Sequence, residues 1–348
     1  MKAGVSSKRR LLFVVLLAIC TPLLAVKIVG VTVSVAALII AVLCVLVASE
    51  VAVEGFGSLF AGLGFTMYVA GVASSLASNL PEAVLAILMT FSPHLRDVAA
   101  VMVVLAVAFN TALLGTLVLL VSWKKGYVDV PQTAMTLEAE AMRMGVVVSL
   151  LYAAVGLLSE TTGRHAILPR EAAVFPLLAY GAYIVALQRR ESVEAAKVDL
   201  KAAVLDTALG MAGIIVGSEL IANVAEYWVS QIGLNPVIAA TVLAFAASVP
   251  EHGIAVIGAL RGQIELGLSN VVSGIVQSIL FVFPLVALVS VVMLDGFVVF
   301  ELIASAAVLW LVEKAITDDK RLTADEGVFL LLTALLGILL LDELSLMI

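Results

Sequence analysis

Long apolar segments recur along the whole chain, and they constrain the fold more than any other feature of the sequence. Of the 348 residues, 63% are hydrophobic and only 13% are charged, whereas a soluble domain is about half apolar and about a quarter charged. The hydrocarbon core of a bilayer is about 30 Å thick and needs about 20 apolar residues per helix. The sequence therefore predicts an all-α membrane protein without a separate soluble domain.

We expect about 11 transmembrane helices. The first is the weakest, because it is short, contains Pro22 and is followed by Lys27. The expected ranges are 11–26, 30–58, 64–90, 98–121, 142–159, 171–188, 202–229, 235–260, 267–292, 295–313 and 326–347.

Lys and Arg residues are concentrated on one side of this predicted arrangement. With the N-terminus in the cytoplasm, fifteen of the 19 Lys and Arg residues fall in cytoplasmic segments, which is the bias that membrane proteins show. The sequence thus predicts a multi-pass protein with a cytoplasmic N-terminus and an external C-terminus. No basic face suits a nucleic acid, so the expected partners are the lipid bilayer and inorganic cations.

The chain contains an internal repeat with a constant offset of 169 positions. Three pairs show it: Ala48-Ser49-Glu50 with Gly217-Ser218-Glu219, Gly64 with Gly233, and Leu80-Pro81-Glu82 with Val249-Pro250-Glu251. The two copies begin five predicted helices apart, so they cross the membrane in opposite directions, as in many secondary transporters. The predicted division is an N-terminal tail and extra helix at 1–29, a first inverted five-helix repeat at 30–190, a charged cytoplasmic link at 191–201 and a second inverted repeat at 202–348.

Glu82 and Glu251 are the strongest candidates for a functional site. Both lie deep inside apolar segments, where a carboxylate costs at least a few kcal/mol and usually faces a polar interior. Each follows a proline, which cannot donate a hydrogen bond to the carbonyl four residues earlier. We therefore expect both helices to break or kink and to free the carbonyl oxygens of Ala77 and Ala246.

Further oxygen-bearing side chains lie near these glutamates, and hard cations such as Ca2+ take six to eight oxygen ligands. Two carboxylates would also balance the charge of one divalent cation. The candidate metal ligands beside the two glutamates and the two carbonyls are Ser78, Asn79, Ser248, Asn110, Ser273, Gln277 and Ser278.

The remaining polar residues in the apolar segments leave alternatives open. Small polar side chains often hold membrane helices together, and this applies to each serine. Acidic residues one helix earlier form either a vestibule or ordinary helix ends: Glu50, Glu54, Glu219 and Glu226. His252 titrates in the useful range and could relay a proton with Glu82 and Glu251, although a lone His is more often a packing residue. Cys20 and Cys44 fit no metal or redox spacing.

These motifs resemble the calcium/cation antiporter superfamily, whose hallmark is an acidic motif in each of two inverted repeats. Leu80-Pro81-Glu82 and Val249-Pro250-Glu251 look like the two motifs of the sodium/calcium exchangers. The resemblance covers most of residues 45–120 and 205–290. It implies that Glu82 and Glu251 are the shared cation-binding carboxylates.

The second repeat looks closer to the calcium/proton branch of this superfamily. Glu251-His252 resembles the acidic-histidine pair of that branch, and the segment 273–278 resembles its serine–glutamine segment. In the first repeat, most polar ligands expected of a sodium/calcium exchanger are replaced by apolar residues, and Asn110 alone remains. The chain reads as a divergent member with features of both branches.

The sequence thus predicts a secondary active antiporter that exchanges Ca2+, or a similar divalent cation, for H+. A Na+/Ca2+ exchanger is the first alternative, and a cation channel or a non-transporting membrane protein is the alternative of another class. Ion-channel filters are usually symmetric rings, which one chain with two repeats does not provide. We expect no enzyme activity, because the three histidines form no His-Glu-x-x-His motif, and no resident cofactor beside the transported ions.

Overall fold

The structure is a computed structural model that describes residues 7–63, 67–130, 132–163, 166–190, 198–260 and 264–347. Within these ranges, the description excludes the side chains of residues 7–8, 67–74, 124–125, 132–134, 187–190, 250–254, 257–260 and 265–266.

The described chain is almost entirely helical, which agrees with the predicted fold class. Each of the predicted segments corresponds to a helix, and the segment predicted at 267–292 is one helical stretch with a π-helical turn, η2, in its middle. The elements are α1 (Ser7–Leu23), α2 (Val31–Gly62), α3 (Met67–Thr90), α4 (Arg96–Lys125), α5 (Gln132–Thr161), α6 (Arg170–Arg190), α7 (Leu200–Tyr227), η1 (Trp228–Ile232), α8 (Pro236–Leu260), α9 (Ile264–Gln277), η2 (Ser278–Val282), α10 (Phe283–Val289), α11 (Gly296–Thr317) and α12 (Ala324–Met347).

The protein is a multi-pass integral membrane protein. Among the described residues, seven helical stretches are long and apolar enough to cross a bilayer. They are Val31–Gly62, Arg96–Trp123, Met135–Thr161, Leu200–Ile232, Gly267–Val289, Gly296–Thr317 and Ala324–Met347.

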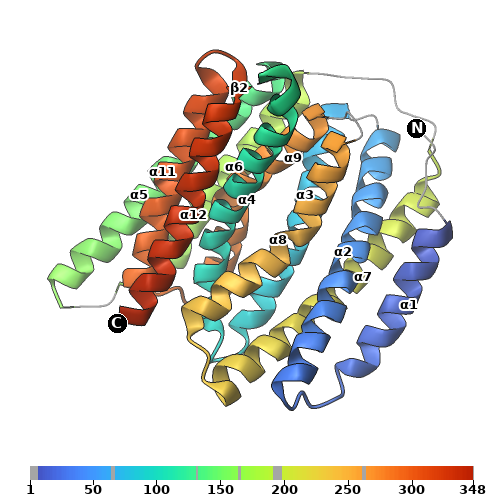
Figure 1. Ribbon diagram of the computed structural model, residues 1–348, viewed down its shortest axis with the longest axis vertical. Helices are drawn as coiled ribbons and strands as arrows, with labels where there is room; N and C mark the ends of the chain where they lie inside the picture. The colour runs from blue at the N-terminus through green and yellow to red at the C-terminus, as the bar shows by residue number, and fades with distance from the viewer. Residues whose placement is uncertain are drawn as a thin grey trace.

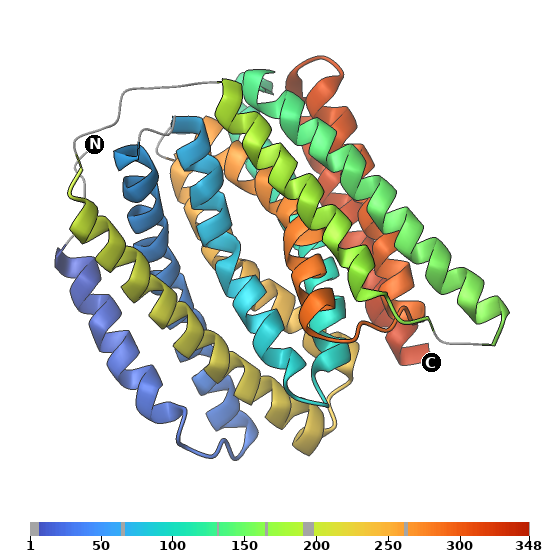
Figure 2. The same ribbon diagram turned by 180° about the vertical axis from the view of Figure 1, so that it is seen from behind.

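Two groups of helices flank a central group (Figures 1 and 2). One flank consists of α1, α2 and α7, and the other of α5, α11 and α12, with α3, α4, α8 and α9 between them. Helix α6 packs against α5, η2 and α10. The large buried apolar cluster extends over the central helices, with α4 contributing an unbroken buried run from Val98 to Val107. The interior of the bundle is therefore where any polar side chain is removed from both lipid and water.

Helices α2 and α7 pack tightly against each other because glycines bring their backbones together. A Cβ atom on Gly210 would lie 2.5 Å from the backbone nitrogen of Ala52 and 2.8 Å from the carbonyl oxygen of Ala48. A Cβ atom on Gly217 would lie 3.2 Å from the carbonyl oxygen of Ala41. Positions 41 and 210 are related by the repeat offset, and so are 48 and 217. The Gly210–Ala48 and Gly217–Ala41 contacts are therefore reciprocal, as expected for two helices related by a two-fold axis.

The thiol group of Cys44 shows the same relation, since it lies 4.0 Å from the carbonyl oxygen of Gly213, 169 positions later. These contacts agree with the predicted repeats at 30–190 and 202–348. The division of the chain into these repeats stays a prediction.

A short two-stranded sheet, which the sequence reading missed, joins two loops at one end of the bundle. Strand β1 (Tyr127–Asp129) follows α4, and the antiparallel strand β2 (Arg321–Thr323) precedes α12. The guanidinium group of Arg321 lies 4.3 Å from the ring centre of Tyr127 and 3.5 Å from a carboxylate oxygen of Asp129. These contacts explain why such short strands form between helices.

Candidate ion-binding site

Glu82 lies in the interior of the bundle, where its charge is fully removed from solvent. The residue is 1% exposed, and neither carboxylate oxygen has a hydrogen-bond partner in the described part of the chain. Ser278, the first residue of η2, lies beside the carboxyl group, but its hydroxyl group donates to the carbonyl of Gly274 at 3.2 Å. A buried carboxyl group without a partner is costly, so this position is one where a bound cation or proton would be strongly favoured.

A network of side-chain hydrogen bonds joins α3 to α9 on the N-terminal side of Glu82. The amide nitrogen of Asn79 donates to the amide oxygen of Gln277 at 2.6 Å. Gln277 in turn donates to Ser75 at 3.2 Å, and Ser78 donates to the amide oxygen of Asn270 at 3.3 Å. All five side chains are buried. The structure thus brings together Ser78, Asn79 and Gln277 as predicted, and it adds Ser75 and Asn270.

The predicted break at the two prolines is not found. Helix α3 continues through Pro81 to Thr90, and α8 continues through position 250 to Leu260. Membrane helices tolerate proline in this way when neighbouring groups satisfy the freed backbone atoms. Proline still has no N–H group, so the carbonyl oxygens of Ala77 and Ala246 lack their usual helical donor. Both alanines are buried, and their carbonyl groups remain candidate ligands.

Other predicted ligands take separate positions. Asn110 on α4 is 0% exposed, and both polar atoms of its amide lack a hydrogen-bond partner within the described structure. Ser248 on α8 is buried, but its hydroxyl group donates to the carbonyl of Ala244 in its own helix at 2.7 Å. Ser273 on α9 donates to Glu138 at 2.6 Å, away from the Asn79–Gln277 pair. Of these three predicted ligands, Asn110 is the one whose polar atoms lack a partner among the described residues, as those of Glu82 do.

Glu251 and His252 belong to α8 by their backbone, but their side chains lie outside the described residues. Their predicted roles as a second cation-binding carboxylate and a proton relay remain predictions. Among the described residues, no group of three or more His, Cys, Asp or Glu side chains could hold a metal ion. The described residues around Glu82 offer amide, hydroxyl and carbonyl oxygens beside its carboxylate.

The acidic residues one helix earlier lie towards the ends of the bundle. Glu50 and Glu54 on α2 face Arg9 of α1, whose guanidinium group is 2.6 Å from Glu54 and 3.6 Å from Glu50. At the opposite end of α7, Glu226 contacts Ser92 and the ring of His94, the latter at 2.7 Å. Glu226 lies at the end of α7, which favours an ordinary helix end for this residue. Glu50 and Glu54 lie well before the end of α2 at Gly62, so both interpretations stay open for them. Glu219 is half-buried.

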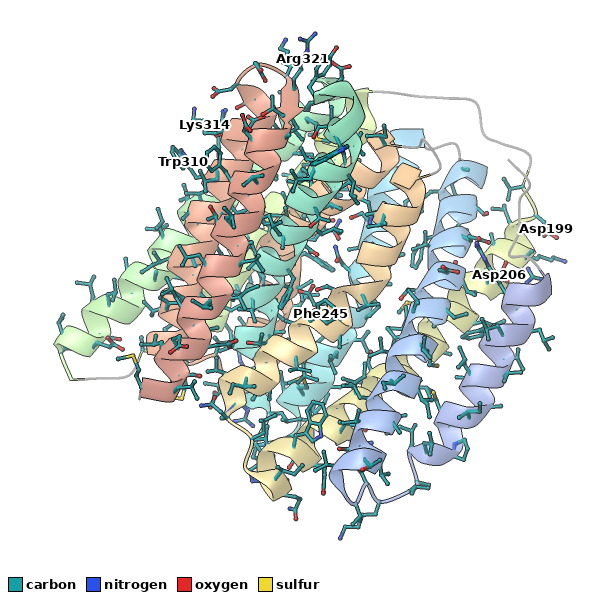
Figure 3. The ribbon with its side chains drawn as sticks, viewed as in Figure 1. Asp199, Asp206, Phe245, Trp310, Lys314 and Arg321 are labelled. Atoms are coloured by element: carbon teal, nitrogen blue, oxygen red, sulfur yellow. The ribbon has the colours of Figure 1, made fainter. Side chains whose placement is uncertain are left out.

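Helix α1 is fixed to α7 by a second ion pair near the same end. The guanidinium group of Arg10 lies 2.8 Å from the carboxylate of Asp206, and Figure 3 shows Asp206 on α7 where α1 begins. The extra N-terminal helix is thus attached to both α2 and α7 through arginines.

Glu138 on α5 is a buried carboxylate that the sequence reading missed. It is 0% exposed and accepts hydrogen bonds from Ser273 on α9 and Tyr183 on α6. The helix was expected to begin at 142, which placed Glu138 in a loop, whereas α5 begins at Gln132. The signal that could have found it is the spacing of Met135, Ala139 and Met142, which lie four and three residues apart and continue the apolar face of the helix towards its N-terminus.

Comparison with known proteins supports an exchanger fold. Residues 203–342 match the family model described as sodium/calcium exchanger protein. No match was found among curated proteins. The crystal structure of the H+/Ca2+ exchanger CAX superimposes with a TM-score of 0.77 at 13% sequence identity, over 98% of this chain and 93% of that chain.

The sodium-calcium exchanger NCX_Mj, soaked with 2.5 mM Na+ and 0.1 mM Ca2+, superimposes with a TM-score of 0.64 at 15% identity. That likeness covers 89% of this chain and 98% of the other. At these identities the likeness to solved structures shows a shared fold. Residues 203–342 thus resemble the sodium/calcium exchanger family, in agreement with the resemblance seen in the sequence, and nearly the whole chain shares the fold of the H+/Ca2+ exchanger.

Proposed function

We propose that this protein is a secondary active antiporter that exchanges Ca2+, or a similar divalent cation, for H+ across a membrane by alternating access. The observation that carries the proposal is the Glu82 carboxyl group, which is 1% exposed and has no hydrogen-bond partner in the described structure. Ionisable groups buried in membrane proteins in this way mark ion or proton pathways.

The groups around Glu82 suit a hard divalent cation. Ca2+ takes six to eight oxygen ligands at about 2.3–2.6 Å. Ser278 of η2 lies beside the Glu82 carboxyl group and would supply one neutral oxygen. Asn79, three residues before Glu82 on α3, and the carbonyl of Ala77 would supply others. Glu251 on α8 would supply the second carboxylate. Two carboxylates then balance the charge of one divalent cation, or they bind about two protons when the cation leaves.

Protons are the favoured coupling ion because they need titratable groups alone. Sodium ions need fixed oxygen ligands of their own, and α4 offers the apolar Met102, Leu105, Ala106 and Val107 where a sodium/calcium exchanger would have polar ones. The fold of the H+/Ca2+ exchanger matches 98% of this chain, whereas that of the sodium-calcium exchanger matches 89%. Na+/Ca2+ exchange is the second candidate, supported by the family model.

Transport into proteoliposomes tests the coupling ion. Purified protein should accumulate Ca2+ above its equilibrium level when an outward-directed H+ gradient is imposed without Na+. An outward-directed Na+ gradient without a pH gradient should give little uptake. Uptake in the sodium condition alone would overturn proton coupling in favour of Na+/Ca2+ exchange, and failure to accumulate against a gradient in either condition would favour a channel.

Glu82→Gln tests the binding site in the same assay. The amide keeps the size of the side chain and removes the charge that would face the cation. Losing one partner of a buried charge interaction costs roughly 2–5 kcal/mol, so Ca2+ affinity should fall by roughly thirtyfold or more. Glu160→Gln is the matched control, because Glu160 is exposed at the end of α5, and it should behave like the wild type. Normal Ca2+ exchange by Glu82→Gln would exclude Glu82 as the binding carboxylate.

A further inference from the structure

We propose that a cavity between α4, α11 and α12 is a binding site for a hydrophobic monoamine, that is, a small apolar molecule that carries one protonated amino group. The acidic group of this site is Glu301 on α11, which belongs to neither repeat motif. The site goes beyond the proposed transport function, because it lies apart from Glu82 on α3 and needs no exchange activity.

The cavity lies where α11 and α12 pack against α4, on the flank of the bundle that these two helices form with α5 (Figure 1). Its volume is about 170 Å³. Small side chains such as those of Ala304 and Ala334 leave this space, and a Cβ atom on Gly337 would meet nothing within 4 Å. An apolar cavity of about 150 Å³ accommodates benzene, so this cavity can hold an apolar group of about that size.

Glu301 lines the cavity as a buried carboxyl group with an unsatisfied oxygen. The residue is 1% exposed, and its Oε1 atom has no hydrogen-bond partner in the described part of the chain. Ser305, one turn later on the same wall, is engaged elsewhere, because its hydroxyl group donates to the carbonyl of Val104 on α4 at 3.3 Å. A buried acceptor without a donor is costly, so a ligand that donates a hydrogen bond to Glu301 is favoured.

The charges at the cavity favour a cationic ligand over a neutral or anionic one. Asp342 of α12 lies close enough to Glu301 for the two carboxyl groups to interact electrostatically. Its Oδ1 atom accepts a hydrogen bond from Thr241 of α8 at 2.8 Å. Among the described residues that line the cavity, none carries a positive charge. An ammonium group at Glu301 therefore supplies both the donor and the positive charge that the lining residues lack.

The acidic and apolar parts of the cavity are arranged as an amphiphilic ligand requires. Because α11 and α12 run antiparallel, Leu340 lies near the level of Glu301, whereas Val308 and Thr333 lie deeper in the bundle. Helix α11 begins at Gly296, so Glu301 is about 7.5 Å along the helix axis from its first residue. The ammonium group of the ligand is then close to the membrane surface and its apolar body points inward, as the side chains of Lys and Arg do in reverse when their charged heads reach the interface.

The lipid phase gives access to the cavity. Leu336 and Leu340 line it and are 55% and 45% exposed. In a membrane these exposed side chains of α12 face the acyl chains, so a hydrophobic amine dissolved in the bilayer can enter from the side.

Thermal unfolding of the purified protein in detergent tests this site, because a ligand that binds only the folded state raises the melting temperature. The cationic probe is phenethylamine at pH 7, whose ring has the size of benzene. The neutral probe is phenethyl alcohol, which has the same apolar body. We expect phenethylamine to raise the melting temperature of the wild type in a saturable way. Phenethyl alcohol should need at least about a tenfold higher concentration for the same rise, because it lacks the charge.

Two substitutions in the cavity should weaken binding for different reasons. Glu301→Gln keeps the size of the side chain but removes its charge, so the apparent affinity for phenethylamine should fall at least about tenfold. Gly337→Leu fills the cavity and should abolish the stabilisation. Gly181→Leu is the matched control, because a Cβ atom on Gly181 in α6 also meets nothing within 4 Å, and it should respond like the wild type.

Each melting temperature is compared with that of the same variant without ligand, so a change in stability does not hide the result. If Glu301→Gln does not fold, the comparison of Gly337→Leu with Gly181→Leu decides alone. Glu82→Gln should keep the wild-type response, because Glu82 does not line the cavity.

Three results would overturn this proposal while the antiporter proposal stands. The first is a wild type that shows no response to phenethylamine or responds equally to both probes. The second is a response that Gly337→Leu retains in full. The third is a response that is lost in Glu82→Gln and unchanged in Glu301→Gln, which would place the amine at the candidate ion-binding site.

Discussion

The buried carboxyl groups of this protein are stabilised in different ways, and the differences separate structural from functional residues. Glu313 accepts two hydrogen bonds from the guanidinium group of Arg143, at 2.6 and 2.9 Å. Glu138 accepts from two hydroxyl groups. Glu82 accepts from no described residue. Glu313 has a fixed cation partner in Arg143, as a structural residue does, whereas the proposed function gives Glu82 a mobile partner, either a cation or a proton.

Breaking the Arg143–Glu313 ion pair should destabilise the fold. The Glu313 side chain is 5% exposed, so Arg143→Leu leaves a buried charge without its partner. Losing one partner of a fully buried pair costs about 3–5 kcal/mol of unfolding free energy. Because the Arg143 side chain is exposed and water screens the pair, we expect a smaller cost of about 1–3 kcal/mol. Thermal unfolding in detergent should show a lower melting temperature for Arg143→Leu. The double variant Arg143→Leu/Glu313→Leu should regain much of the loss, and a double variant less stable than the single one would contradict this account.

At the residue scale, the sequence predicts what depends on local pattern. Glu82 could be identified because a carboxylate inside an apolar segment is unusual wherever it occurs, and the matching Glu251 strengthened the prediction. Glu138 could not, because its significance depends on Tyr183, 45 positions later, and on Ser273, 135 positions later. No local pattern shows that three distant helices meet at one oxygen atom.

At the scale of elements, the contact between α2 and α7 depends on glycines in α7, which have no side chain to hold the two backbones apart. The backbones approach so closely at Gly210 that a Cβ atom would lie within 3 Å of three backbone atoms of α2. Small residues permit such close packing between membrane helices, where van der Waals contact supplies much of the association energy. Because this contact joins two helices of different predicted repeats, it also sets how those repeats lie relative to each other.

Gly210→Ala should therefore weaken the structure although alanine favours helices. Forcing extra volume into a tight contact costs about 1–3 kcal/mol. Gly181→Ala is the matched control, because a Cβ atom on Gly181 in α6 would meet nothing within 4 Å. The control should be neutral or stabilised by up to about 1 kcal/mol, since alanine is the better helix former. The two variants are compared by their melting temperatures in detergent. Equal melting temperatures would show that the close approach of α2 and α7 leaves enough room for an alanine side chain at position 210.

Helix existence was predictable from the sequence, whereas helix ends and interruptions were not. Apolar length alone identified the membrane segments, because lipid demands it. The beginning of α5 was placed ten residues too late, since its first turns carry Glu138 and Glu140, which resemble a loop until the partners of Glu138 are known. The π-helical turn η2 was also missed. Such turns often mark functional sites, and Ser278 at its start lies beside Glu82.

At the scale of the whole molecule, the two ends of the bundle differ in charge. Helix α12 begins at the end that holds β2 and finishes at the opposite end (Figure 1). Arg321 and Lys314 lie towards the end that holds β2 (Figure 3). At the other end, backbone hydrogen bonds join the α5–α6 loop to the loop between α10 and α11: Leu168 donates to Val292, and Leu294 donates to Ala166.

Membrane orientation follows from this asymmetry, because Lys and Arg collect in cytoplasmic loops. The β1–β2 end should face the cytoplasm and the α5–α6 loop should face outside. Two exposed positions test this: Asp319→Cys before β2 and Thr162→Cys after α5. The native Cys20 and Cys44 are buried, so they should contribute little background labelling. In intact cells, a membrane-impermeant maleimide should label Thr162→Cys and leave Asp319→Cys unlabelled.

Permeabilised cells provide the control, because both engineered cysteines should then react. Labelling of Asp319→Cys in intact cells, with Thr162→Cys protected, would reverse the orientation of the whole molecule. That result would also place the β1–β2 sheet outside and the α5–α6 loop in the cytoplasm.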